Sequence, residues 1–178
     1  GMKLALLPKK TRGETVFLSF NLHFGDEKSL FGNRTVSGFA AGMLSRGSSK
    51  YTRQQLSEEL DRLRTKMSVS GQGQVASVSV ETVRKNVPQV LALMREILRQ
   101  PSFPKDEFEQ MRKQVLADLE ASRKQPDAMA QRALARHFII YPKGDVRYIG
   151  TVEEDAAAVQ ALTLEQVKRS YGNFYGAS

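Results

Sequence analysis

The chain has 178 residues, no cysteine and a formal net charge of +8, from 27 Lys and Arg against 19 Asp and Glu. This length suits one ordinary domain, and 40% hydrophobic with 26% charged residues excludes collagen-like, low-complexity and wholly disordered chains. Without thiols there are no disulfide scaffolds, thiolate zinc sites, iron–sulfur clusters or cysteine nucleophiles, and no apolar run is long enough to span a membrane as a helix.

The first part of the chain predicts strands followed by two helices. Residues 3–7 form a short apolar run that we expect as an edge strand, and residues 16–24 alternate like a half-buried strand. Residues 29–44 predict a helix rich in small residues. Thr52 opens the next helix, with Gln55 in capping-box register.

A hairpin and a series of helices follow. Residues 66–70 and 74–80 alternate, and Gly71-Gln72-Gly73 between them predicts a β-hairpin. The remaining segments have helical spacing or helix start signals. The predicted helices are 84–100, from Pro104 to near Gln125, 127–138, 151–162 and 163–171, and the last two start with capping boxes at Thr151 and Thr163. This order predicts an α+β fold, an antiparallel sheet with helices packed mainly on one face.

Side chains able to carry chemistry are few. We interpret His23 as a surface histidine of its strand. His137 is interpreted as a helix-end histidine near the terminal carbonyls, with a place in a pocket as the alternative. Asp118 and Glu120 point to different sides of the long helix, so they do not form a carboxylate pair. The sequence contains no GxGxxG, P-loop, GxSxG or HExxH motif.

The run from Val36 to Ser48, VSGFAAGMLSRGS, resembles the active-site helix of the insulinase/pitrilysin-type (M16) zinc peptidases. The motif of that family is H-x-x-E-H, followed by apolar residues and then Gly-Thr or Gly-Ser. Leu98 to Pro104, LRQPSFP, is similar to the L-x-x-P-x-F that precedes the long helix of the family. The resemblance extends over nearly the whole chain and implies the M16-peptidase-like (LuxS/MPP-like) α+β fold.

The resemblance also locates the lost catalytic positions. It places the first histidine at Gly38, the glutamate at Ala41 and the second histidine at Gly42, and the third zinc ligand at Asp118. Glycine and alanine side chains offer no donor atom, and one aspartate cannot hold a catalytic zinc. We therefore expect no catalytic residue, no metal and no hydrolysis in this domain alone. Gly38 and Gly42 also fit close packing of the helix on a sheet.

M16 members consist of homologous halves or paired subunits, of which one carries the zinc. The resemblance implies that residues 1–178 are a single M16-like domain, cut from a larger peptidase and lacking its closing strand; Gly1 ahead of Met2 agrees with such a cut. Its implied roles are to wall the peptide chamber, to pair with a catalytic M16 domain or subunit and to contact an unfolded peptide. Zinc is expected in the catalytic half.

Two other functions stay open. One is a non-proteolytic structural or assembly subunit of the same fold, and the other is a basic anion- or nucleic-acid-binding module. The hypothesis of an anion- or nucleic-acid-binding module rests on the net charge. Because the basic residues are interleaved with acidic ones, we do not expect nucleic acid as the partner. We interpret Arg136 and Tyr141 as structural, with substrate contact as the alternative. The compartment, bacterial periplasm or cytoplasm, stays open.

Overall fold

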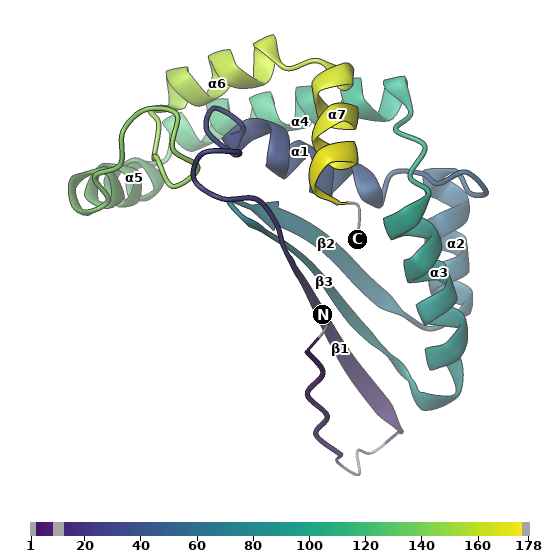
Figure 1. Cartoon of the computed structure of the whole chain (residues 1–178). Coiled ribbons are helices and arrows are strands. Elements are labelled where there is room, and N and C mark those ends of the chain that lie inside the picture. Colours follow the sequence, from purple (N-terminus) through teal and green to yellow (C-terminus); the bar gives the residue numbers. More distant parts are fainter. Residues whose placement is uncertain (1–2, 9–12, 176–178) are drawn as a thin grey trace.

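The computed structural model describes residues 3–8 and 13–175 (Figure 1). A short 3-10 turn at Arg84–Asn86 lies between the sheet and the later helices. The strands and α-helices are, in chain order, β1 (Thr15–His23), α1 (Arg34–Leu44), α2 (Arg53–Arg62), β2 (Lys66–Gln72), β3 (Val75–Val83), α3 (Val87–Arg99), α4 (Lys105–Arg123), α5 (Pro126–Phe138), α6 (Val152–Ala161) and α7 (Leu164–Phe174).

The three strands form one antiparallel sheet in the order β1-β3-β2. Val78 and Val80 of β3 are buried on one face, whereas Ser79 between them is exposed on the other. The helices gather over the apolar face and one end of the sheet (Figure 1). The predicted α+β fold, with helices mainly on one face, is confirmed.

The core lies between the sheet and this helical layer. Helix α3 faces it with an apolar stripe whose residues Val90 and Ile97 are buried. The rings of Phe39 in α1 and Phe108 in α4 meet edge to face at 6.0 Å, which joins the two helices. No helix among the described residues is both long and apolar enough to cross a bilayer.

The predicted helix starts at threonine are confirmed in detail. At each of these helix starts, the threonine hydroxyl accepts a hydrogen bond from the backbone N–H of the residue three positions later. The side chain of that later residue accepts a hydrogen bond from the backbone N–H of the threonine. The pairs are Thr52 with Gln55, Thr151 with Glu154 and Thr163 with Gln166.

The predicted start of α1 is wrong, because the helix begins at Arg34 rather than at residue 29. Asp26 Oδ1 accepts hydrogen bonds from the backbone N–H groups of Lys28 (3.0 Å) and Ser29 (2.8 Å), which closes a local turn. Gly32 follows with φ +78°, a conformation outside the α-helix. The side-chain cap of Asp26 therefore competes with a helix that the apolar spacing alone favours.

Other predicted boundaries also differ. Residues 3–7 are not a strand, and they pair with no described strand; their leucines are exposed. The hairpin strands continue through the expected loop, so the connection is Gly73-Gln74, with Gly73 at φ +58°. The helix expected from residue 84 starts at Val87, after the 3-10 turn.

Candidate functional site

Helix α1 carries Gly38, Ala41 and Gly42, where the resemblance places the catalytic residues of the family, and it lies directly on β2. A Cβ on Gly71 of β2 would overlap the Cβ of Ala41 and lie 3.3 Å from the carbonyl oxygen of Ser37. A Cβ on Gly38 would lie 3.6 Å from the carbonyl oxygen of Gly71, an ordinary contact. The helix and strand backbones can approach this closely only because small residues face each other, as the sequence predicted.

The space beside Gly42 is filled by a side chain of α4. A Cβ on Gly42 would overlap the Cε of Met111 and lie 3.2 Å from its Sδ. A histidine at Gly42 would therefore require Met111 to move. The packing of Gly42 on a sheet, which the sequence suggested, is therefore wrong, since its neighbour is a side chain of α4. Sequence reasoning missed this contact, because the register of one helix against another depends on tertiary packing and leaves no local pattern.

Asp118 is not brought into a ligand cluster. It lies further along α4 on the exposed side, where Oδ1 accepts a hydrogen bond from Nε2 of Gln114 at 2.8 Å. Among residues 3–8 and 13–175, no group of three or more His, Cys, Asp or Glu side chains is arranged to hold a metal ion. The donor atoms needed for a catalytic zinc are thus not assembled in the described part of the chain.

The two histidines lie on separate elements. His23 is exposed at the end of β1. His137 is exposed in the last turn of α5, with its ring 5.3 Å from the ring of Phe138. Glu120 pairs with Arg123 and Lys124 on an exposed face of α4, as expected of a solvated carboxylate.

Tyr141 belongs to a structural cluster in the loop after α5. The guanidinium of Arg147 lies 3.8 Å from the centre of the Tyr141 ring. The same guanidinium donates two hydrogen bonds to the carboxylate of Asp145, at 2.9 and 2.7 Å. These bonds, with that from the Arg147 backbone N–H, lower the pKa of Asp145 to about 2. Arg136 is exposed on α5.

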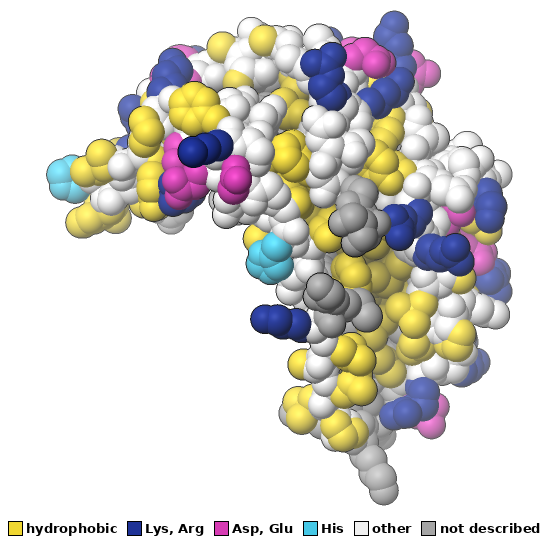
Figure 2. Space-filling view, viewed as in Figure 1, with side chains coloured by type: hydrophobic (Ala, Val, Ile, Leu, Met, Phe, Trp, Pro, Cys, Tyr) yellow, Lys and Arg dark blue, Asp and Glu magenta, His cyan; other side chains and the backbone are white. Residues whose placement is uncertain are grey.

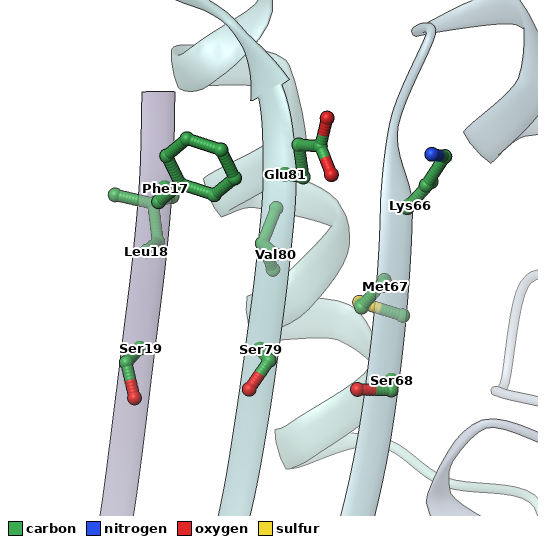
Figure 3. Close-up of a pocket in the computed structure, with 9 residues that line it drawn as sticks. All are labelled: Phe17, Leu18, Ser19, Lys66, Met67, Ser68, Ser79, Val80 and Glu81. Atoms are coloured by element: carbon green, nitrogen blue, oxygen red, sulfur yellow. The ribbon is translucent and has the colours of Figure 1, made fainter. Parts of the chain in front are cut away.

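The uncovered face of the sheet holds a shallow hollow of about 460 Å³ (Figure 3). Ser19, Ser79 and Ser68 lie in register across the three strands and form a row of hydroxyls. At the next register position the ring of Phe17 leans toward Glu81 (Figure 3). This surface can form hydrogen bonds and aromatic contacts. Within the described part of the chain no hydrogen bond joins these hydroxyls to the Glu81 carboxylate, so the row is not arranged as an activated nucleophile.

Fold and site define a class: an α+β domain in which a helix rich in small residues packs closely on an antiparallel sheet. The family model described as Insulinase (Peptidase family M16) matches residues 19–145. Because the match covers more than half of the chain, the protein belongs to the M16 peptidase family. No curated protein matches the chain significantly.

Solved structures show the same fold. One, described as a peptidase M16 inactive domain from Pseudomonas fluorescens, has a TM-score of 0.71 at 21% identity and covers 90% of this chain. A protease from Helicobacter pylori has a TM-score of 0.73 and 13% sequence identity, and the match covers 91% of this chain. The periplasmic protease PqqL from Escherichia coli has a TM-score of 0.73 and 15% sequence identity, and that match also covers 91% of this chain. This chain covers 40%, 38% and 18% of those chains, respectively.

Proposed function

We propose that this chain is a non-catalytic domain of an M16 zinc metallopeptidase, which walls the peptide chamber and pairs with a catalytic M16 domain or subunit. The observation that carries the proposal is the helix α1. Gly38, Ala41 and Gly42 offer no ligand or general base, and Met111 fills the space beside Gly42. The residues present do not fit a catalytic zinc, so the metal and the hydrolytic step belong to the partner.

Pairing is supported by an exposed apolar surface on α5 and the loop after it. Leu134, Phe138 and Ile140 are 59%, 73% and 85% exposed, and α5 has no buried residue. Hydrophobic side chains also gather over this projecting part of the molecule in the space-filling view (Figure 2). Apolar groups clustered in this way mark interaction sites in soluble proteins. The greater length of the similar solved chains agrees with a partner domain.

The test combines the chain with a separately produced M16 subunit that has an intact H-x-x-E-H motif. Sedimentation velocity measures the complex, and a quenched fluorescent peptide without stable structure measures hydrolysis. We expect no hydrolysis by the chain alone, and a complex that Leu134→Glu with Phe138→Glu abolishes. Leu91→Glu, at a half-exposed position on α3, is the matched control. Zinc-dependent cleavage by the chain alone would contradict the proposal.

A further inference from the structure

Helix α5 contributes almost nothing to the core. None of its residues is buried, whereas α3, which is also 13 residues long, buries five. Only Ala128, Arg132 and Ala135, spaced along one side of α5, are half-buried. In Figure 1 α5 projects from the helical layer to one side, beyond the sheet. An element that buries so little surface needs little free energy to leave its place in the fold.

The connection between α4 and α5 interrupts the helical hydrogen bonds. Helix α4 ends at Arg123, and Gln125 has an extended backbone, with φ −104° and ψ 110°, directly before Pro126. Proline has no backbone N–H, so Pro126 cannot continue the hydrogen bonds of α4. The position of α5 relative to α4 therefore depends on the backbone dihedral angles of Lys124 and Gln125, and a few such residues are enough for a hinge.

A single side chain of α5 holds the helix to the rest of the domain by hydrogen bonds. Nη1 of Arg132 donates to the carbonyl oxygen of Gly150 and to Oδ2 of Asp155, both at 2.7 Å. Within residues 3–8 and 13–175, no other side chain of α5 forms a hydrogen bond or an ion pair with another element. We call this pair of contacts the Arg132 latch.

The acceptors of the latch are closely packed. Asp155 also pairs with Arg34 of α1, so its carboxylate is held between two guanidinium groups. A Cβ on Gly150 would overlap Oδ1 of Asp155 and lie 3.2 Å from Nη2 of Arg34. A side chain at Gly150 would therefore displace Asp155, which makes Gly150 the second residue on which the latch depends.

We propose that α5 is a hinged arm, which leaves the rest of the domain as a unit at Lys124-Gln125 and is held closed by the Arg132 latch. Opening exposes no core residue, so it does not require the domain to unfold. The arm carries Leu134 and Phe138 of the pairing surface, and its consequence for pairing rests on the proposed function. A released arm must be ordered again when the catalytic subunit binds, so the latch strengthens the complex.

Spin labels on the intact chain measure the position of the arm. The chain has no cysteine, so labels can be attached at introduced cysteines alone. Gln89→Cys on α3 with Ala133→Cys on α5 reports the arm by double electron–electron resonance. Gln89→Cys with Lys113→Cys on α4 is the matched pair outside the arm, and all three positions are exposed. We expect a narrow distance distribution for both pairs while the latch is intact.

Loss of the latch should move the arm alone. Arg132→Gln should add a second 89–133 component, displaced by more than the width of the original peak, and leave the 89–113 distance unchanged. Gly150→Ala should act in the same direction, because it displaces Asp155 without altering α5. Arg136→Gln is the matched control, since Arg136 is an exposed arginine of α5 outside the latch, and it should leave both distances unchanged.

Three results would overturn the proposal. The first is an unchanged 89–133 distribution in Arg132→Gln. The second is a broadening of both pairs together, which would mean that the whole domain is loosened. The third is an 89–133 distribution that is already broad with the latch intact, because Arg132 would then not hold the arm. Opening by Arg132→Gln but not by Gly150→Ala would support the arm and remove Gly150 from the latch.

Sedimentation velocity with the catalytic subunit separates the arm from the pairing. Arg132→Gln should weaken the complex severalfold. Arg136→Gln should not, because Arg136 lies on the side of α5 opposite to Leu134 and Phe138. No complex with the unaltered chain would refute the pairing and leave the result for the arm standing. An arm that stays closed in Arg132→Gln, with an intact complex, would refute only this inference.

Discussion

At the residue scale, the fold depends most on the contact between Gly71 and helix α1. A methyl group on Gly71 would meet the Cβ of Ala41 and the backbone oxygen of Ser37, and a backbone atom cannot move aside as a flexible side chain can. We expect Gly71→Ala to lower the free energy of unfolding by about 1–3 kcal/mol, the usual cost of overpacking. Urea denaturation measures it.

Gly38→Ala is the matched control for that experiment. The nearest atom to its new methyl group would be 3.6 Å away, and Ala favours a helix over Gly, so the free energy of unfolding should rise by up to about 1 kcal/mol. Equal losses in the two variants would show that α1 and β2 are not packed as described.

Gly42 and Met111 should be energetically coupled. Gly42→His forces the Met111 side chain away and should lower the free energy of unfolding by about 1–3 kcal/mol, whereas Met111→Ala makes room for the new ring. The double variant should therefore be more stable than the sum of the single effects predicts, by about 0.5–3 kcal/mol in a double-mutant cycle. Additive effects would mean that the two positions are not in contact.

At the scale of elements, the Asp155 carboxylate links α6 to both α1 and α5. Its carboxylate forms ion pairs with Arg34 of α1 and with Arg132 of α5, the second at 2.7 Å, and its side chain is 14% exposed. Asp155→Asn should lower the free energy of unfolding by about 1–3 kcal/mol, because two guanidinium groups lose a charged acceptor. Glu120→Gln, an exposed ion-paired site, should change it by less than about 0.5 kcal/mol. Thermal or urea unfolding compares them, and equal effects would contradict the assignment.

The loop after α5 and the first turn of α6 make the stability sensitive to acid. The Arg147 side chain holds the pKa of Asp145 at about 2, and Lys143, the Thr151 N–H and the Tyr148 hydroxyl hold that of Glu154 at about 2. Both folded-state pKa values lie below the unfolded values, so the unfolded chain binds more protons at low pH. This contribution to stability is present above about pH 4.5 and is lost as the pH falls toward 2.

Urea midpoints measured from pH 7 to pH 2.5 test this dependence. The wild-type midpoint should fall with acid, and Asp145→Asn should be less stable at pH 7 and should show a shallower fall. A wild-type curve as shallow as that of the variant would mean that the Asp145–Arg147 contact does not form in solution.

The sequence predicted those features of the elements that have local causes. Three capping boxes are correct because threonine and its partner are three residues apart, and the alternation in β3 reports directly which face is buried. The predicted start of α1 was wrong because the turn closed by Asp26 favours a non-helical conformation in the residues before Arg34. This turn is also a local feature of the sequence. The contact of Met111 with Gly42 could not be predicted, because it depends on how α4 lies against α1.

At the scale of the whole molecule, the basic side chains of residues 3–8 and 13–175 do not gather into a separate site. Arg34, Arg46 and Arg132 pair with carboxylates on other elements and so join parts of the fold. Arg95 and Arg99 differ in lacking acidic partners among the described residues, and they adjoin an apolar cavity rather than a flat basic surface. The distribution therefore does not favour general binding to phosphate backbones.

We propose above all that this M16 domain holds no catalytic zinc and acts through its fold and its surfaces. Equilibrium dialysis of the intact chain against zinc, followed by elemental analysis and a peptide-cleavage assay on the same sample, tests it most directly. The account predicts no stoichiometric zinc and no cleavage. One zinc per chain, together with cleavage that a chelator abolishes, would contradict it.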